Sequence, residues 1–121
     1  MSNTFFGLSV DCADAATLAQ FWADVLGRGL AADPSGESAV LTADAEGVHG
    51  PRLAFHRVPE PKTVKNRLHL DLITTEFDAE TQRLLDLGAR RVRDVRQGGA
   101  RWTTFADIEG NEFDLIAGKD N

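Results

Sequence analysis

An internal repeat of about 60 residues is the feature that most constrains how this chain can fold. Residues 6–8 align with residues 68–70 at an offset of 62, residues 26–27 with 87–88 at 61, and residues 50–53 with 110–113 at 60. One such unit buries little apolar surface alone, whereas two copies side by side bury more and leave a trough between their sheets. The repeat therefore predicts two similar modules that fold together.

Each half contains one predicted amphipathic helix. In the first half, apolar residues recur with a period of about 3.6 over residues 18–26, which makes one apolar stripe. Asp14 is a suitable N-cap for this helix, and Gly27 suits the left-handed position that ends it. The second helix is predicted from about residue 77 to residue 87.

The remaining apolar segments predict short strands. Strands are expected near residues 6–10, 39–43, 52–58, 68–72, 90–96, 101–106 and 112–116, with a weaker one near 29–32. Each half then has the order strand, helix, strand, strand, strand. We expect one domain over residues 1–121, with module 1 at about 4–58, a connection at 59–66 and module 2 at about 67–117. The predicted fold class is α+β, with two tandem βαβββ modules.

Composition restricts the class of protein. The chain has 121 residues, 42% apolar and 26% charged, with a formal net charge of -6, which is ordinary for a soluble globule. We expect no nucleic-acid partner because the balance is acidic, and no membrane partner because no apolar run reaches the roughly 18 residues of a membrane helix. Cys12 is the single cysteine, and residues 1–10 carry no basic stretch before an apolar one. These features predict a cytoplasmic protein.

Five arginines fall within twelve positions, between residues 90 and 101, and only Asp94 opposes them there. A solvated strand edge, on which long cations discourage aggregation, is the simpler interpretation. A site for a small anionic ligand is the alternative. Trp102, which follows the cluster, either packs in the core or offers a flat surface to a ligand ring.

Four segments together resemble the glyoxalase and bleomycin-resistance group, also called the vicinal oxygen chelate superfamily. They are DCADAATLAQFWADVLG (11–27), NRLHLDL (66–72), LLDLGARRV (84–92) and DIEGNEFDLI (107–116). The resemblance implies paired βαβββ modules that form a half-open barrel of about eight strands around a cupped site. It also implies a homodimer, and either metal-dependent chemistry or metal-free sequestration of a ligand.

The resemblance also implies where metal ligands would lie. The family takes one ligand from the first strand and one from the fourth strand of each module, which places them at Gly7, Ala54, His69 and Asp114. Glycine and alanine have no donor atoms, so half of the set is missing. We therefore expect no metal cofactor. If a divalent metal binds, its ligands are expected to be His69 and Asp114, with His56 as a further candidate.

The function that follows is a small-molecule-binding protein of the glyoxalase and bleomycin-resistance type that lacks the usual metal site. The alternative is a lyase, isomerase or dioxygenase of the same superfamily that uses a metal or acid-base chemistry. No catalytic residue can be assigned, and His69 is the best candidate because a histidine beside a carboxylate can hold a proton near neutral pH. The expected ligand-binding residues are Ser9, Asp11, His56, His69, Asp71, Trp102 and Asp114.

Overall fold

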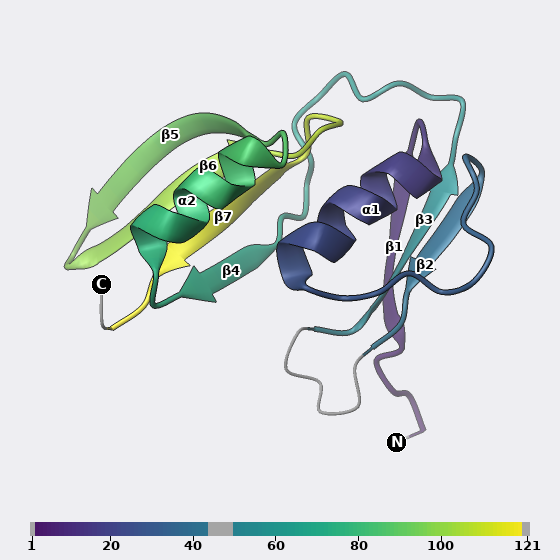
Figure 1. Cartoon of the computed structure of the whole chain (residues 1–121), viewed down its shortest axis with the longest axis horizontal. Coiled ribbons are helices and arrows are strands. Elements are labelled where there is room, and N and C mark those ends of the chain that lie inside the picture. Colours follow the sequence, from purple (N-terminus) through teal and green to yellow (C-terminus); the bar gives the residue numbers. More distant parts are fainter. Residues whose placement is uncertain (1, 44–49, 120–121) are drawn as a thin grey trace. The chain divides into compact units, whose positions relative to one another are not determined.

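The computed structural model describes residues 2–43 and 50–119, which form two compact units. The first unit, Met1–Pro61, contains β1 (Gly7–Cys12), α1 (Ala15–Leu26), β2 (Ser38–Leu41) and β3 (Arg52–Arg57). The second unit, Lys62–Asn121, contains β4 (Asp71–Thr74), α2 (Phe77–Asp86), β5 (Arg90–Gln97), β6 (Ala100–Ala106) and β7 (Glu112–Ala117). The described residues thus confirm the α+β class and the tandem modules (Figure 1).

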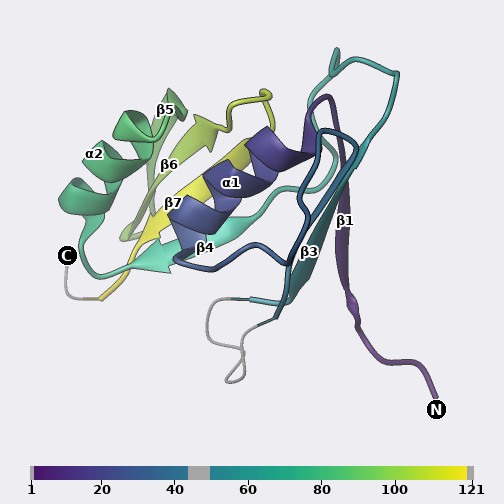
Figure 2. The ribbon, with the colours of Figure 1, turned by 45° about the vertical axis from the view of Figure 1, so that its right-hand side comes forward.

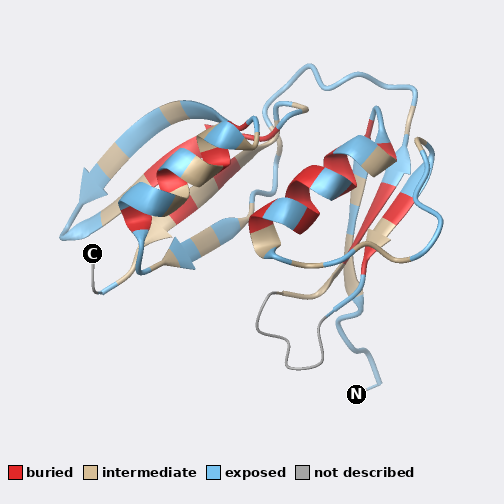
Figure 3. Ribbon diagram, in the orientation of Figure 1, coloured by how far each residue is buried: buried red, intermediate tan, exposed pale blue. Residues whose placement is uncertain are grey.

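The first unit is a three-stranded sheet with one helix. Its strand order is β1-β3-β2, with β1 parallel and β2 antiparallel to the central β3. The helix α1 begins and ends as predicted, because the Asp14 carboxylate accepts the Thr17 N–H at 3.1 Å and Gly27 adopts a left-handed conformation with φ of 66°. Its apolar stripe supplies much of the unit's core: Leu18, Phe21, Trp22 and Val25 are all buried (Figure 3).

The second unit is a four-stranded sheet with α2 along one face, as two views show (Figures 1 and 2). Its strand order is β4-β7-β6-β5, with β4 parallel to β7 and the other neighbours antiparallel. Beneath the helix lie the fully buried rings of Phe105 and Phe113, stacked with centroids 5.7 Å apart. Within the described residues, no helix is both long enough and apolar enough to cross a membrane.

Three predicted strand features differ from the structure. Residues 29–32 contribute only an isolated bridge, between Leu30 and Leu41, so the described residues form seven strands and not eight. The strand expected at 68–72 begins at Asp71, and Leu68 is 82% exposed and not packed beneath α2. The sheets are separate three-stranded and four-stranded sheets that do not close into a barrel.

The late start of β4 is explained by one side chain, that of Asn66. The Asn66 side chain bonds to the backbone of Glu112, accepting its N–H at 2.8 Å and donating to its carbonyl at 3.1 Å. An amide side chain therefore occupies the place on β7 that a longer β4 would have paired with. Regular pairing begins only after the Asp114 N–H donates to the Leu70 carbonyl at 2.9 Å.

The strand registers reproduce the internal repeat residue by residue. In the first unit Ser9 pairs with Ala54, and in the second unit Asp71 pairs with Asp114. These pairs are related by the offsets of 62 and 60 that the sequence shows. The neighbouring strand on the other side also corresponds. Val40 on β2 pairs with Ala54 in the first unit, and Thr104 on β6 pairs with Asp114 in the second. The three positions are all polar in the second unit, where they are Asp71, Asp114 and Thr104. In the first unit they are Ser9, Ala54 and Val40, and only Ser9 is polar.

Candidate functional site

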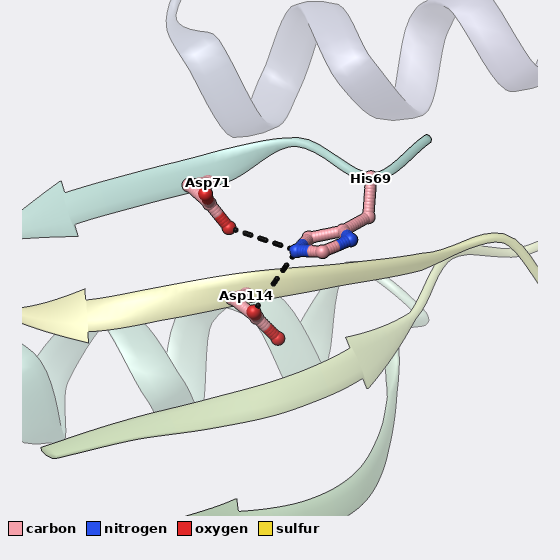
Figure 4. Close-up of side chains that lie close together, drawn as sticks. All are labelled: His69, Asp71 and Asp114. Carbon is pink, nitrogen blue, oxygen red and sulfur yellow. Dashed lines mark ion pairs between the residues drawn. The ribbon is translucent and has the colours of Figure 1, made fainter. Parts of the chain in front are cut away.

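His69, Asp71 and Asp114 form a polar cluster in the second unit (Figure 4). The His69 Nε2 atom lies 3.3 Å from Asp71 Oδ1 and 3.4 Å from Asp114 Oδ2. The side chains of His69 and Asp71 are 49% and 55% exposed, whereas that of Asp114 is only 16% exposed. The cluster is thus accessible to a ligand and is anchored by one largely buried carboxylate.

Strand pairing brings the two carboxylates together. Asp71 is the first residue of β4, and its register partner on the parallel strand β7 is Asp114. His69 lies two residues before Asp71 in an extended segment, so its side chain reaches the same face of the sheet. The Asn66 amide fixes the start of this segment against Glu112.

Thr104 completes the cluster from the neighbouring strand β6. Its hydroxyl donates a hydrogen bond of 2.6 Å to Asp114 Oδ1, which leaves Oδ2 on the side of His69. A short hydrogen bond from a buried hydroxyl to a carboxylate fixes the carboxylate's rotation. Sequence reasoning missed Thr104 because nothing in its neighbourhood distinguishes it from Thr103, and only the pairing of β6 with β7 identifies it.

A charged pair lies at the start of β7, next to this cluster. Lys65 Nζ lies 2.5 Å from Glu112 Oε1, and Arg93 lies 3.4 Å from the same oxygen. The hydrogen bond from Lys65 holds the pKa of the Glu112 carboxyl below its usual value, and Arg93 adds a smaller effect in the same direction. The pair therefore joins the segment before β4 to β7 most firmly when Glu112 is ionised.

The three donors of the cluster are close enough together to hold a divalent cation. One ligand atom from each of His69, Asp71 and Asp114 lies within 4.8 Å of the others. Two ligands of one such cation lie roughly 3.0–3.4 Å apart when each bond is about 2.1 Å long, and the His69–carboxylate distances agree. The third candidate metal ligand is therefore Asp71. The sequence had suggested His56 as the further ligand, but His56 lies on β3 in the first unit.

Among the described residues of the first unit, no equivalent set of donors lies together. A Cβ atom at Gly7, the counterpart of His69, would lie 2.5 Å from the Arg52 carbonyl oxygen, so the backbone of β3 occupies the space of a side chain. Ala54, the counterpart of Asp114, is fully buried. The other residues predicted to bind ligand here are Ser9, Asp11 and His56, which are all exposed. Asp11 and His56 are register partners on β1 and β3.

Trp102 is not one of the three clustered side chains, although it precedes Thr104 by two residues on β6 and so lies on the same face of the sheet. It is half-buried on β6 and lines a cavity of about 320 Å³ between α2 and the β5–β6 hairpin. None of the other six residues predicted to bind ligand lines this cavity. The structure thus brings together three of the seven predicted residues, His69, Asp71 and Asp114. It places Ser9, Asp11 and His56 in the other unit.

Comparison with known proteins decides the family. The model of a family described as Glyoxalase-like domain matches residues 7–116, which is nearly the whole chain. The chain belongs to this family. The resemblance to the vicinal oxygen chelate superfamily is thereby confirmed. A search of curated proteins found no match to this glyoxalase-like chain.

Solved structures share the fold of this glyoxalase-like domain. A mutant of the fosfomycin resistance protein FosX from Listeria monocytogenes, complexed with Mn(II) and a dihydroxypropylphosphonic acid, has a TM-score of 0.77 at 15% identity. The match covers 98% of this chain and 93% of that one. A glyoxalase-related enzyme from Fulvimarina pelagi has a TM-score of 0.71 at 16% identity, covering 96% and 88%. The hypothetical protein SA1046 from S. aureus has a TM-score of 0.69 at 15% identity, covering 98% and 99%.

Proposed function

We propose that this glyoxalase-like domain is a small-molecule-binding protein whose polar contacts come from His69, Asp71 and Asp114. The observation that carries the proposal is the meeting of these three side chains on one accessible face, with His69 Nε2 within 3.4 Å of both carboxylates. Two carboxylates against one imidazole leave a net negative charge there. The cluster therefore favours a ligand that presents hydrogen-bond donors or a positive charge.

The absence of a metal cofactor remains part of this proposal. Gly7 and Ala54 have no donor atoms, and the close approach of β3 to Gly7 leaves no room for a larger side chain. Without those two ligands the cluster offers three donors on one side only. We expect the purified protein to hold substoichiometric metal by elemental analysis, and EDTA to leave its melting temperature unchanged.

A metal-dependent enzyme of the superfamily is the second candidate, and one observation favours it. The three ligand atoms lie within 4.8 Å of one another, and the related FosX was solved with Mn(II). A divalent cation held by His69, Asp71 and Asp114 would supply Lewis-acid polarisation of a bound oxygen. One equivalent of tightly held Zn, Fe, Mn or Ni per chain would favour this enzyme over the metal-free protein.

Ligand binding at the cluster is tested with His69→Ala. The variant and the parent are titrated with the same set of small cationic and hydroxylated compounds by ligand-observed NMR, and both are melted. Loss of one hydrogen bond to a buried partner weakens binding by roughly 1–3 kcal/mol, while the exposed imidazole contributes little to stability. A large fall in melting temperature with unchanged affinity would reject the role of His69.

His56→Ala is the companion variant, because it removes the same side chain from an exposed position in the first unit. Unchanged affinity in His56→Ala confines the ligand to the cluster. An equal loss in His56→Ala would show that binding also depends on His56 in the first unit and is not confined to the cluster.

We further propose a homodimer in the cytoplasm. Apolar side chains that are three-quarters exposed lie beside or on the edge strands β1 and β4, among them Phe6 and Ile73. Pairing of two copies would cover them. The single cysteine, Cys12, is buried, which agrees with a reducing compartment.

A further inference from the structure

The helix-covered side of the second unit contains a cavity that the His69 cluster does not use. The cavity, about 320 Å³, lies between α2 and the β5–β6 hairpin. Its volume is at the lower end of the roughly 300–1,000 Å³ that is usual for small-molecule sites. Arg101 places its guanidinium 4.1 Å from the centroid of the Phe77 ring on α2, so this face of β6 is the one that carries the helix. Thr104 and Asp114 point to the other face.

The charge of the cavity lining is positive. Three arginines, Arg91, Arg96 and Arg101, line it against two carboxylates, Asp78 and Asp94. Both carboxylates already have partners, since Asp78 lies 3.3 Å from Arg101 and Asp94 accepts the Thr103 hydroxyl at 2.6 Å. Among the residues that the structure describes, Arg91 and Arg96 pair with no carboxylate.

A buried hydroxyl adds a second, independent sign of a ligand. Thr81 on α2 lines the cavity and is 93% buried, being 7% exposed. Its Oγ1 atom has no hydrogen-bond partner among the described residues. Burying a hydroxyl without a partner costs free energy, and an acceptor in the cavity would supply the missing hydrogen bond once the Thr81 side chain rotates toward it.

We propose that this cavity binds the oxyanion of a small molecule, a phosphate or carboxylate group, through Arg91, Arg96 and the Thr81 hydroxyl. Guanidinium groups recognise planar or tetrahedral oxyanions by paired N–H donors, and a neutral hydroxyl adds a donor without adding charge. Phe77, which also lines the cavity, offers apolar surface to the rest of the molecule. The arginine-rich stretch of β5 and β6 is then a binding wall and not merely a solvated edge.

The test uses the full chain labelled with ¹⁵N, titrated with inorganic phosphate at constant ionic strength. Saturable shifts of amide signals around Thr81, Arg91 and Arg96 are expected. The double substitution R91Q/R96Q should raise the dissociation constant at least about tenfold, and Thr81→Val should raise it less. Arg90→Gln is the control for the single variants R91Q and R96Q, because each removes one positive charge from the same strand and Arg90 does not line the cavity.

The outcomes separate the proposal from its rivals. A parallel titration with acetate identifies the group: saturation by acetate as well indicates a general oxyanion site, and saturation by phosphate alone indicates a phosphate site. Shifts that do not saturate with either anion, or an equal loss in Arg90→Gln, would overturn the proposal, because the arginines would then act only as a diffuse positive surface. His69→Ala should leave phosphate binding unchanged, so failure here is distinguishable from failure of the His69 cluster.

Discussion

Thr104 and Asp114 share a hydrogen bond of 2.6 Å across β6 and β7, and this bond fixes which carboxylate oxygen is available to His69. The opposite face of the same strand has a matching pair, since Thr103 donates to Asp94 over the same distance. One strand therefore carries two similar hydroxyl–carboxylate contacts, one on each face of the sheet. Only the contact of Thr104 belongs to the cluster.

The first prediction compares these two contacts. Thr104→Val should lower the free energy of unfolding by roughly 1–2 kcal/mol and also weaken ligand or metal binding at the cluster, because Asp114 loses its donor. Thr103→Val should cost a similar amount of stability and leave that binding unchanged. Urea denaturation and ligand titration of both variants check this. Equal effects on binding would show that Thr104 acts only through stability.

The second prediction concerns the unpartnered hydroxyl of Thr81. Thr81→Val keeps the side-chain shape and removes a buried polar atom that has no partner among the described residues. The free energy of unfolding should rise by about 0.5–1 kcal/mol in phosphate-free buffer, since valine and threonine have similar helix propensities. Thr103→Val, whose hydroxyl is paired, should change stability in the opposite direction. A loss of stability in Thr81→Val would contradict the prediction.

The third prediction concerns pH. The pKa of Glu112 is lowered in the folded chain, chiefly by the Lys65 hydrogen bond, so the unfolded state takes up a proton at a higher pH than the folded state. The pair therefore contributes stability above the ordinary carboxyl value of 4.5, and this contribution is lost as the pH falls through the folded pKa. Denaturation between pH 3 and pH 7 should show Lys65→Gln less stable than the parent at the upper end, with the difference shrinking toward the lower end.

Lys62→Gln is the control for that series. It removes the same charge from the same connecting segment, but in the described part of the chain Lys62 has no carboxylate partner. Its effect on stability should not vary over the acidic range. A difference between Lys65→Gln and the parent that persists unchanged at the lowest pH would show that Lys65 acts by packing and not through Glu112.

The fourth prediction concerns the close approach of β1 and β3. Gly7→Ala places a Cβ atom 2.5 Å from the Arg52 carbonyl oxygen, so one of the two strands must move. The expected loss is about 1–3 kcal/mol of unfolding free energy. Gly29→Ala, where an added Cβ meets nothing within 4 Å, should stay within roughly 1 kcal/mol of the parent. Equal melting temperatures for the two variants would refute the close contact.

The fifth prediction concerns assembly. Light scattering at tens of micromolar and neutral pH should give twice the 13.2 kDa mass of one chain. Ile73→Lys, on the edge strand β4, should shift the mass toward one chain, whereas Val64→Lys, equally exposed but in the connecting segment, should not. A single-chain mass for the parent would contradict the proposed homodimer.

The sequence predicted the local features of the fold well and the long-range ones less well. Asp14 and Gly27 end α1 as expected, because caps depend only on neighbouring backbone groups. The strand expected at 68–72 begins only at Asp71, because the Asn66 amide, far from β7 in sequence, occupies the pairing position on β7.

The candidate site shows the same division. Aligning the two halves was enough to match His69 with Gly7 and Asp114 with Ala54, and the registers agree with that alignment. The role of Thr104 beside Asp114 follows only from the pairing of β6 with β7, which the sequence does not specify. The unpartnered hydroxyl of Thr81 likewise depends on burial that an amphipathic pattern cannot quantify.

The close fit of β1 on β3 has a consequence for any attempt to engineer a symmetric metal site in this chain. A histidine at position 7 would meet the Arg52 carbonyl, and an aspartate at position 54 would put a carboxylate where alanine is fully buried. Each substitution would need compensating changes in its neighbours before the new ligand could be accommodated. Single substitutions can therefore remove the candidate metal ligands of the second half more easily than they can add ligands to the first half. The difference between the two halves is for this reason hard to reverse by point mutation.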